Sequence, residues 1–152
     1  MDEFFFQKTK TRIDQLATAG KRALLLWDDS RLEKPESWFL KGLCSVDSSK
    51  AKRLTRIKKG YYKRPASRIC VPGFHWTGVL LSALGEIPSV CQMSWWTTRG
   101  KYKEIGTNIM FRMLKQLHQQ VSQRRLHVLD RGYANAWTIE WMSHFGQDFL
   151  VR

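Results

Sequence analysis

Apolar side chains recur along the chain with helical spacing in three stretches. Residues 3–18 carry them on one side before an Ala-Gly stop, which predicts a helix. Residues 104–123 repeat them every four positions and predict the clearest helix of the chain. Residues 136–145 predict a third helix, with Asn135 as its cap and Gly146 at its end. The apolar stripe of this last helix consists of Trp137, Trp141 and Phe145.

Other apolar runs are short and bounded by turn residues, which is typical of strands. The first run, "RALLLW", is continuous and suits a strand buried on both faces. Two longer runs on either side of "GEIPS" predict a hairpin. Residues 30–70 are polar and predict an irregular loop. The five predicted strands cover residues 22–27, 74–84, 89–97, 126–129 and 148–152.

The order of these elements predicts an α/β fold. A helix and a strand precede the hairpin, and a helix, a strand, a helix and a strand follow it. This order favours a mixed five-stranded sheet, with three antiparallel strands and then two parallel ones, and flanking helices. It is the element order of the ribonuclease-H-like fold. In that topology the first and fourth strands lie side by side and parallel, so their carboxyl ends are neighbours.

The charge of the chain changes the range of expected partners. The 152 residues are 43% hydrophobic, as in a globular domain, and carry a formal net charge of +13. Such a basic chain suggests a polyanion such as DNA. Residues 50–68 contain cations and no carboxylate, which favours phosphate contact about as much as a merely solvated loop. The candidate DNA-binding cations are Lys50, Lys52, Arg53, Arg56, Lys58, Lys59, Lys63, Arg64 and Arg68.

Other features narrow the class of protein. Three widely spaced cysteines form no CxxC pair, so the pattern indicates neither a zinc site nor a disulfide framework. The N-terminus is acidic and then aromatic, unlike a secretory signal. No apolar run is long enough to cross a bilayer. We therefore expect a cytoplasmic protein with no membrane partner.

Acidic side chains follow the first and fourth predicted strands. Asp28 and Asp29 end the first, and Asp130 ends the fourth. Taken singly, each of these acids fits a turn or a helix cap. Together, at neighbouring strand ends, they repel one another unless a divalent cation lies between them. Because side chains alternate along a strand, only one of Asp28 and Asp29 can point at Asp130. The pattern predicts a site for Mg²⁺ or Mn²⁺.

Two segments that contain these acids resemble DDE transposases of the bacterial insertion-sequence type. "LLLWDDSRLEKP" is similar to their first-aspartate segment, and "VLDRGYANAWTIEWMSHFGQDFLVR" is similar to their second. The resemblance implies a ribonuclease-H-like core that cuts and joins DNA with two metal ions. It makes Asp29, which precedes Ser30, the first catalytic metal ligand, and Asp130 the second. Asp28 and Arg131 become accessory residues.

The resemblance is incomplete, because no position matches the third acid of that family, a Glu in a Tyr-x-x-Arg-x-x-x-Glu pattern. We therefore expect a C-terminally truncated fragment, with an N-terminal helix over residues 1–20 and a partial catalytic domain over residues 21–152, inactive alone. The resemblance further implies transposon ends and target DNA as partners, a homodimer as one state of the intact enzyme, and a location at the nucleoid of a bacterium. The alternatives are a non-catalytic remnant that binds nucleic acid through its charge, and a structural domain, which the charge disfavours.

Overall fold

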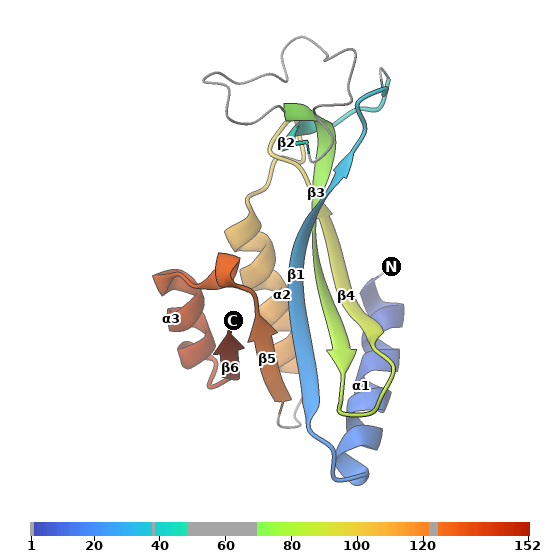
Figure 1. Ribbon diagram of the computed structural model, residues 1–152, viewed down its shortest axis with the longest axis vertical. Helices are drawn as coiled ribbons and strands as arrows, with labels where there is room; N and C mark the ends of the chain where they lie inside the picture. Colours follow the sequence, from blue (N-terminus) through green and yellow to red (C-terminus); the bar gives the residue numbers. More distant parts are fainter. Residues whose placement is uncertain (1, 38, 49–69, 122–124) are drawn as a thin grey trace. The chain divides into compact units, whose positions relative to one another are not determined.

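The computed structural model describes residues 2–37, 39–48, 70–121 and 125–152 (Figure 1). Helices and strands alternate in the order expected from the apolar pattern, with one additional strand. In chain order, the elements are α1 (Asp2–Thr18), β1 (Ala23–Glu33), β2 (Cys44–Asp47), β3 (Cys70–Ser82), β4 (Ser89–Trp96), α2 (Gly106–Gln120), β5 (Arg125–Leu129), the 3-10 helix η2 (Arg131–Tyr133), α3 (Ala136–His144) and β6 (Asp148–Val151).

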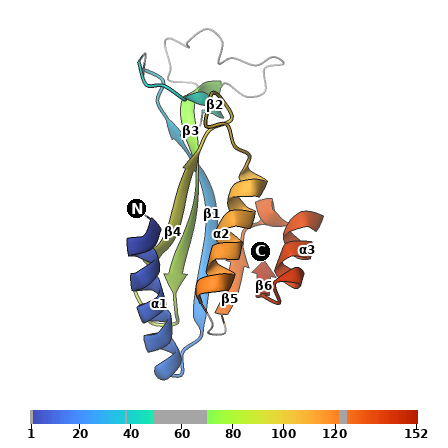
Figure 2. The ribbon, with the colours of Figure 1, turned by 180° about the vertical axis from the view of Figure 1, so that it is seen from behind.

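The strands form one mixed sheet of six strands in the order β2-β3-β1-β5-β6, and β4 also pairs with β3 (Figures 1 and 2). β5 is parallel to both β1 and β6, and β2 is antiparallel to β3. The predicted mixed α/β fold with flanking helices is therefore confirmed, as is the parallel pairing of the first and fourth predicted strands. The predicted number of five strands is wrong, because β2 arises within a stretch that was interpreted as an irregular loop.

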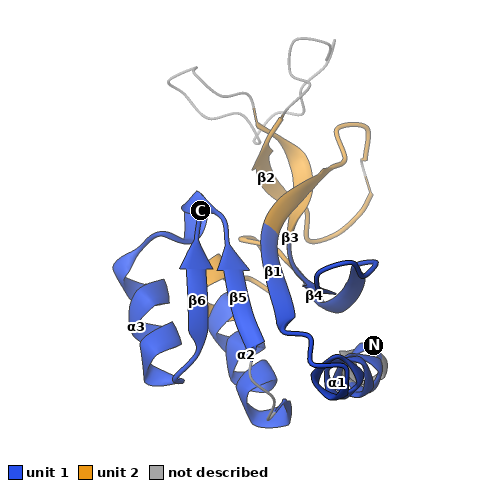
Figure 3. Ribbon diagram, turned by 60° about the horizontal axis from the view of Figure 1, so that its bottom comes forward, with its two compact units in different colours: residues 1–28, 77–94, 110–152 blue, residues 29–76, 95–109 orange. Residues whose placement is uncertain are grey.

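The chain divides into two compact units, coloured separately in Figure 3. The first unit comprises Met1–Asp28, Thr77–Ser94 and Met110–Arg152, and the second comprises Asp29–Trp76 and Trp95–Ile109. Both β1 and β3 contribute residues to each unit. Each unit has its own buried apolar side chains, so we describe each by itself.

In the first unit, side chains alternate between a buried and a half-buried face of the sheet. Along β1 and β5 the buried positions include Leu25, Trp27, His127 and Leu129. Their sequence neighbours on the other face, Leu24, Leu26, Leu126 and Val128, are only half-buried. The register continues this second face into β6, where Leu26 lies opposite Val128 and Val128 opposite Leu150, which is 55% exposed. We call the row Leu26, Val128 and Leu150 the open row.

The part of α2 from Met110 onward and the whole of α3 belong to the first unit and cover its buried face. The predicted stripe of α2 is confirmed for Met113, Leu114 and Leu117, which are almost completely buried, and is wrong for Ile105, which precedes the helix and is 50% exposed. The expected face of α3 is wrong for Trp137, which is 62% exposed. Thr138 and Met142 are the buried residues of that helix. The aromatic side chains of α3, Trp137 and Trp141, are exposed or half-buried, and the smaller side chains of Thr138 and Met142 face the core. None of the described helices is both long and apolar enough to span a lipid bilayer.

In the second unit, β1 continues past its predicted end at Trp27 to Glu33, and β2 pairs with the first residues of β3. Cys44, Val46 and Val71 form the buried cluster of this ladder. Gly73 permits the close approach of its strands. A Cβ added to Gly73 would lie 2.4 Å from Cγ2 of Val46 and 2.5 Å from the carbonyl oxygen of Leu32.

Candidate functional site

The register of the ladder between β1 and β5 indicates which acid of β1 corresponds to Asp130 in the first unit. Its last paired residues are Leu26 and Val128. The same offset, carried two residues further, puts Asp28 opposite Asp130. Adjacent strands lie about 4.8 Å apart, so this extended register predicts neighbouring backbones at the two positions. Both residues are exposed, and Asp28 shares the face of the open row because side chains alternate along β1.

Asp130 also shapes the turn that follows β5. Its backbone is extended, and its Oδ1 accepts a hydrogen bond of 2.6 Å from the backbone N–H of Gly132 at the start of η2. A Cβ on Gly132 would lie 2.9 Å from that same oxygen, so glycine allows this close approach. Arg131, between them, is exposed. The turn interpretation of Asp130 is thus correct, and the bond fixes one carboxylate oxygen at the carboxyl end of the strand.

A buried pair of rings lies directly before these acids. Trp27 Nε1 donates a hydrogen bond of 2.9 Å to Nδ1 of His127, and the two rings are stacked with centroids 5.9 Å apart. His127 is completely buried, and its Nε2 lies 3.3 Å from Oε1 of Gln147. Burial, assisted by the nearby Arg125, lowers the pKa of His127 to about 4. The imidazole is therefore neutral at physiological pH, accepts at Nδ1 and carries its proton on Nε2.

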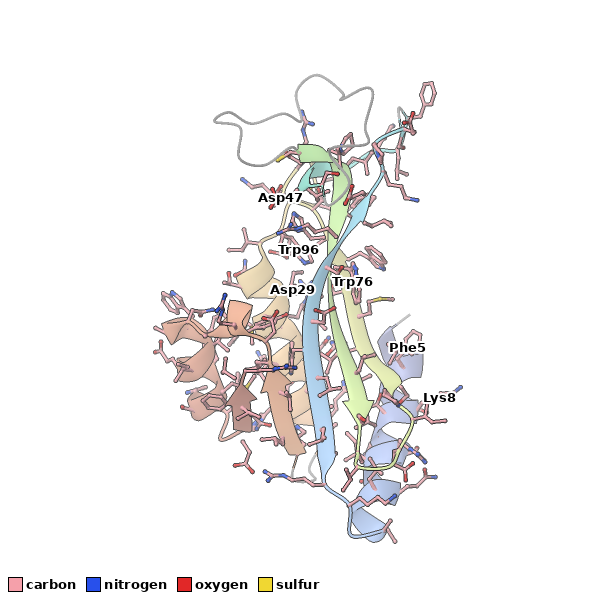
Figure 4. The ribbon with its side chains drawn as sticks, viewed as in Figure 1. Phe5, Lys8, Asp29, Asp47, Trp76 and Trp96 are labelled. Atoms are coloured by element: carbon pink, nitrogen blue, oxygen red, sulfur yellow. The ribbon has the colours of Figure 1, made fainter. Side chains whose placement is uncertain are left out.

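Asp29, the first residue of the second unit, has different surroundings from Asp28. It contributes to an open depression of about 680 Å³ (Figure 4). The described side chains that line this depression come from β1, β2, β3 and β4 and the residue after β2, and all belong to the second unit. They are Asp29, Ser30, Arg31, Glu33, Asp47, Ser48, His75 and Trp96.

Hydrogen bonds and one ion pair order the charged side chains of the depression. Arg31 Nη1 lies 3.1 Å from Oδ2 of Asp47. The Ser48 hydroxyl donates to Glu33 Oε2 over 2.7 Å, and the Cys70 thiol lies 3.6 Å from Oδ1 of Asp47. The wall of the depression therefore contains the guanidinium of Arg31 as well as carboxylates, and one of these carboxylates is paired with it.

His75 stacks on Trp96 in the depression, with ring centroids 4.3 Å apart and an interplanar angle of 15°. Burial lowers the pKa of His75, the charge of Arg31 lowers it further, and the carboxylates of Asp29 and Asp47 oppose that change. His75 is therefore mainly neutral near pH 7.

The structure thus groups the predicted acids in two ways. Asp28 and Asp130 belong to the first unit, and Asp29 belongs to the second with Asp47 and Glu33. The shared magnesium ion of Asp29 and Asp130 stays a prediction. Among the described residues, no group of three or more His, Cys, Asp or Glu side chains is arranged to hold a metal ion.

Several residues of these sites were not predicted as a group. Trp27 and His127 each sit at a buried position of a predicted strand, which was a usable signal for their pairing once the two strands were aligned. Asp47 and Glu33 fell in the stretch interpreted as a loop, so no strand alternation was available to orient them. The predicted DNA-binding cations of residues 50–68 lie outside the described residues. The three cysteines are free and buried, as expected of small apolar side chains.

Comparison with known proteins adds no assignment to this geometry. No family model matches the sequence, and no curated protein or solved structure gives a significant match to the chain.

Proposed function

We propose that this chain is part of the catalytic domain of a DDE-type DNA transposase with a ribonuclease-H-like fold. In that function, an acid in the middle of β1 and the acid that follows β5 hold Mg²⁺ or Mn²⁺, and intact enzymes of this type cut and join DNA. The proposal rests on the resemblance of the two acidic segments, and on one observation that supports it. That observation is the parallel pairing of β1 with β5, whose register, carried two residues past its last pair, favours Asp28 of β1 as the partner of Asp130.

The strand order supports the same fold. Leaving β2 aside, the order β4-β3-β1-β5-β6 corresponds to the strand order 3-2-1-4-5, with the last two strands parallel to the first. This arrangement is the one expected for a ribonuclease-H-like sheet, and β2 is an addition at one edge. In it, β1 and β5 are adjacent inner strands, and the acids of the proposed site belong to the middle of β1 and to the residue after β5.

The donor atoms fit part of a site for a hard divalent cation. Asp28 and Asp130 would hold the ion through carboxylate oxygens, which are the ligands that Mg²⁺ prefers. The sequence pattern favours Asp29 as the first ligand, whereas the register favours Asp28. No residue of the chain matches the family's third acid. The proposed site is therefore a two-acid part of the complete one.

The residues of the chain itself have distinct tasks in this proposal. A bound divalent ion would polarise a phosphodiester and lower the pKa of bound water. The Gly132 N–H keeps Oδ1 of Asp130 in a fixed position. Arg131, exposed at the same turn, is suited to contact a phosphate oxygen of the DNA backbone. The hydrogen bond between Trp27 and His127 holds the two strands in register beneath the acids.

Manganese binding tests this proposal without requiring the complete active site. We expect the full chain to bind Mn²⁺, measured by electron paramagnetic resonance, and the Asp130→Asn variant to lose that binding. If the register defines the site, Asp28→Asn should also lose Mn²⁺ binding and Asp29→Asn should keep it. The opposite result for these two variants would identify Asp29 as the ligand, as the sequence pattern predicts. Asp14→Asn is the matched control, because Asp14 is an exposed acid of α1.

Failure of the wild-type chain to bind Mn²⁺ would overturn the proposal, as would unchanged binding in all three variants. The second candidate function, a non-catalytic nucleic-acid binder, is favoured by the net charge of +13 and by the unmatched third acid. It predicts DNA affinity that falls steeply with salt and does not depend on a divalent ion. Binding measured with EDTA and then with Mg²⁺ therefore separates the two functions.

A further inference from the structure

The connection between β4 and α2 in the second unit presents aromatic rings and cations side by side in the sequence "WWTTRGKYK". Trp95 is 49% exposed and Tyr102 is 79% exposed. Arg99, Lys101 and Lys103 are exposed as well. Single exposed apolar side chains are ordinary, whereas exposed rings that share one short segment with cations suggest an interaction surface. We call residues 95–104 the aromatic-basic loop.

Backbone hydrogen bonds close the aromatic-basic loop into a defined shape. Thr97 forms a parallel bridge with Lys103, and the Glu104 N–H donates to the Thr97 carbonyl over 2.8 Å. The Lys103 N–H donates to the Gly100 carbonyl over 3.2 Å, and Gly100 adopts a positive φ of 76°. The hydroxyl of the buried Thr97 donates to the Gly42 carbonyl over 2.6 Å. The loop is thus anchored at its base, and its tip is preorganised.

The exposed rings have support from neighbouring side chains. Trp95 packs against Trp76 of β3, labelled in Figure 4, with ring centroids 6.1 Å apart and planes tilted by 41°. This pair and the pair formed by His75 and Trp96 lie on opposite faces of the sheet, because side chains alternate along β3 and β4. The Lys101 ammonium lies 5.7 Å from the centroid of the Tyr102 ring. A ring held in this way loses little conformational entropy when a ligand stacks on it.

The charge of the aromatic-basic loop favours an anion. Its single carboxylate, Glu104, accepts a hydrogen bond of 3.2 Å from Asn108 in the first turn of α2. No carboxylate in the described part of the chain forms an ion pair with Lys101 or Lys103. Cations that alternate with exposed rings match a nucleic-acid strand, in which phosphates alternate with flat bases. Duplex DNA presents its phosphates but keeps its base faces stacked, so it could not use the rings.

We infer that the aromatic-basic loop binds single-stranded DNA, with bases stacked on Trp95 and Tyr102 and phosphates held by Lys101, Lys103 and Arg99. This inference deepens the proposed function, because it rests on DNA as the substrate and names the unpaired form. It involves neither Asp28, Asp29 nor Asp130. The strand contact can therefore be tested with the metal removed.

Fluorescence anisotropy with a labelled oligothymidine, in EDTA and with the full chain, tests the inference. We expect Trp95→Ala and Tyr102→Ala each to weaken binding about tenfold. Tyr102→Phe keeps the ring and should bind like the wild-type chain. Lys101→Gln and Lys103→Gln should each reduce the slope of log affinity against log salt by about 0.7. Phe39→Ala is the matched control, because Phe39 is a 96% exposed aromatic side chain of the same unit outside the loop.

A duplex oligonucleotide supplies the second comparison. Its affinity should fall with salt but change less than about twofold in Trp95→Ala and Tyr102→Ala, since paired bases cannot stack on the rings. Folding of each variant is verified by its unfolding midpoint in urea. Wild-type-like single-strand affinity in both folded alanine variants would overturn the inference, as would equal losses for single strand and duplex. Either result leaves the manganese test of the proposed function unaffected, so the two failures are distinguishable.

Discussion

The indole N–H of Trp27 in β1 donates to Nδ1 of His127 in β5, over 2.9 Å and across 100 residues of sequence. Both side chains are buried, and both precede the acids of the proposed metal site by one to three positions. The bond satisfies a polar group of each ring in the core, where leaving either without a partner would be costly. The same hydrogen bond therefore stabilises the first unit and helps to position the strands that carry the acids.

Acid should destabilise the protein through His127. Its pKa is about 4 in the folded chain and near 6.5 when exposed. Above pH 6.5 both states are neutral. Between pH 6.5 and 4 the unfolded state binds a proton that the folded state does not. The free energy of unfolding therefore decreases as the pH is lowered, and this loss is complete below about pH 4. The expected loss is about 3 kcal/mol.

Urea unfolding at pH 7 and pH 4.5 measures this loss. The His127→Gln variant can still accept the Trp27 hydrogen bond but cannot titrate, so its stability should fall less between these two pH values than that of the wild-type chain. An equal fall in the two proteins would show that other groups cause the acid sensitivity.

Trp27→Phe should destabilise the protein even though it keeps a buried ring. The change removes the N–H donor and leaves Nδ1 of His127 buried, so we expect a loss of about 1–3 kcal/mol in the free energy of unfolding. Trp95→Phe is the control, because Trp95 is 49% exposed. The control should change stability by less than about 0.5 kcal/mol. Equal effects of the two substitutions would contradict the structural role of the hydrogen bond.

Gly73→Ala should disrupt the ladder between β2 and β3. The added methyl group would meet Val46 Cγ2 at 2.4 Å and the Leu32 carbonyl oxygen at 2.5 Å, and a backbone oxygen cannot move without breaking the strand. We expect the free energy of unfolding to decrease by about 2 kcal/mol or more. Adding Val46→Ala should rescue little of it, since the carbonyl contact remains. Full rescue by Val46→Ala would show that only the side chain is limiting.

The two faces of the β1–β5–β6 sheet should respond differently to truncation. Leu129 is 1% exposed, so Leu129→Ala should cost about 2–5 kcal/mol. Leu150 in the open row is 55% exposed, so Leu150→Ala should cost less than about 1 kcal/mol. Chemical denaturation of both variants measures the difference. A large loss in Leu150→Ala would mean that another molecule covers the open row in solution.

The sequence predicted the elements of the first unit well, because their periodicity is regular. The repeat in α2 and the short apolar run of β5 identify both without ambiguity, and Asn135 accepts a hydrogen bond from the Thr138 N–H as its cap position requires. Gly146 has a φ of 58° just after α3, as expected of a helix-ending glycine. Local patterns sufficed where one face of an element is buried.

The second unit was harder to predict for a physical reason. β1 from Asp28 to Glu33 is polar, because its residues line the open depression or face solvent, so it lacks the apolar alternation of a strand. β2 is only four residues long and is defined by its partner. Both the second half of β1 and the whole of β2 form through pairing with segments far away in the sequence. A local pattern of residues cannot predict such pairing.

The candidate acids were found because they follow apolar runs, but their pairing depends on one residue of register. Sequence similarity alone selected Asp29, whereas the register of the ladder, carried past its last pair, favours Asp28. The depression around Asp29 was not predictable, because it requires Asp47 and His75 from strands far away in the chain.

Two consecutive acids on β1 make the chain unusually sensitive to insertions and deletions. Removing one residue between Ala23 and Trp27 would exchange the faces of Asp28 and Asp29 and bring the second carboxylate opposite Asp130, with no change in the acids themselves. The same deletion would separate Trp27 from His127. Evolution of this strand can therefore proceed by substitution far more readily than by change of length.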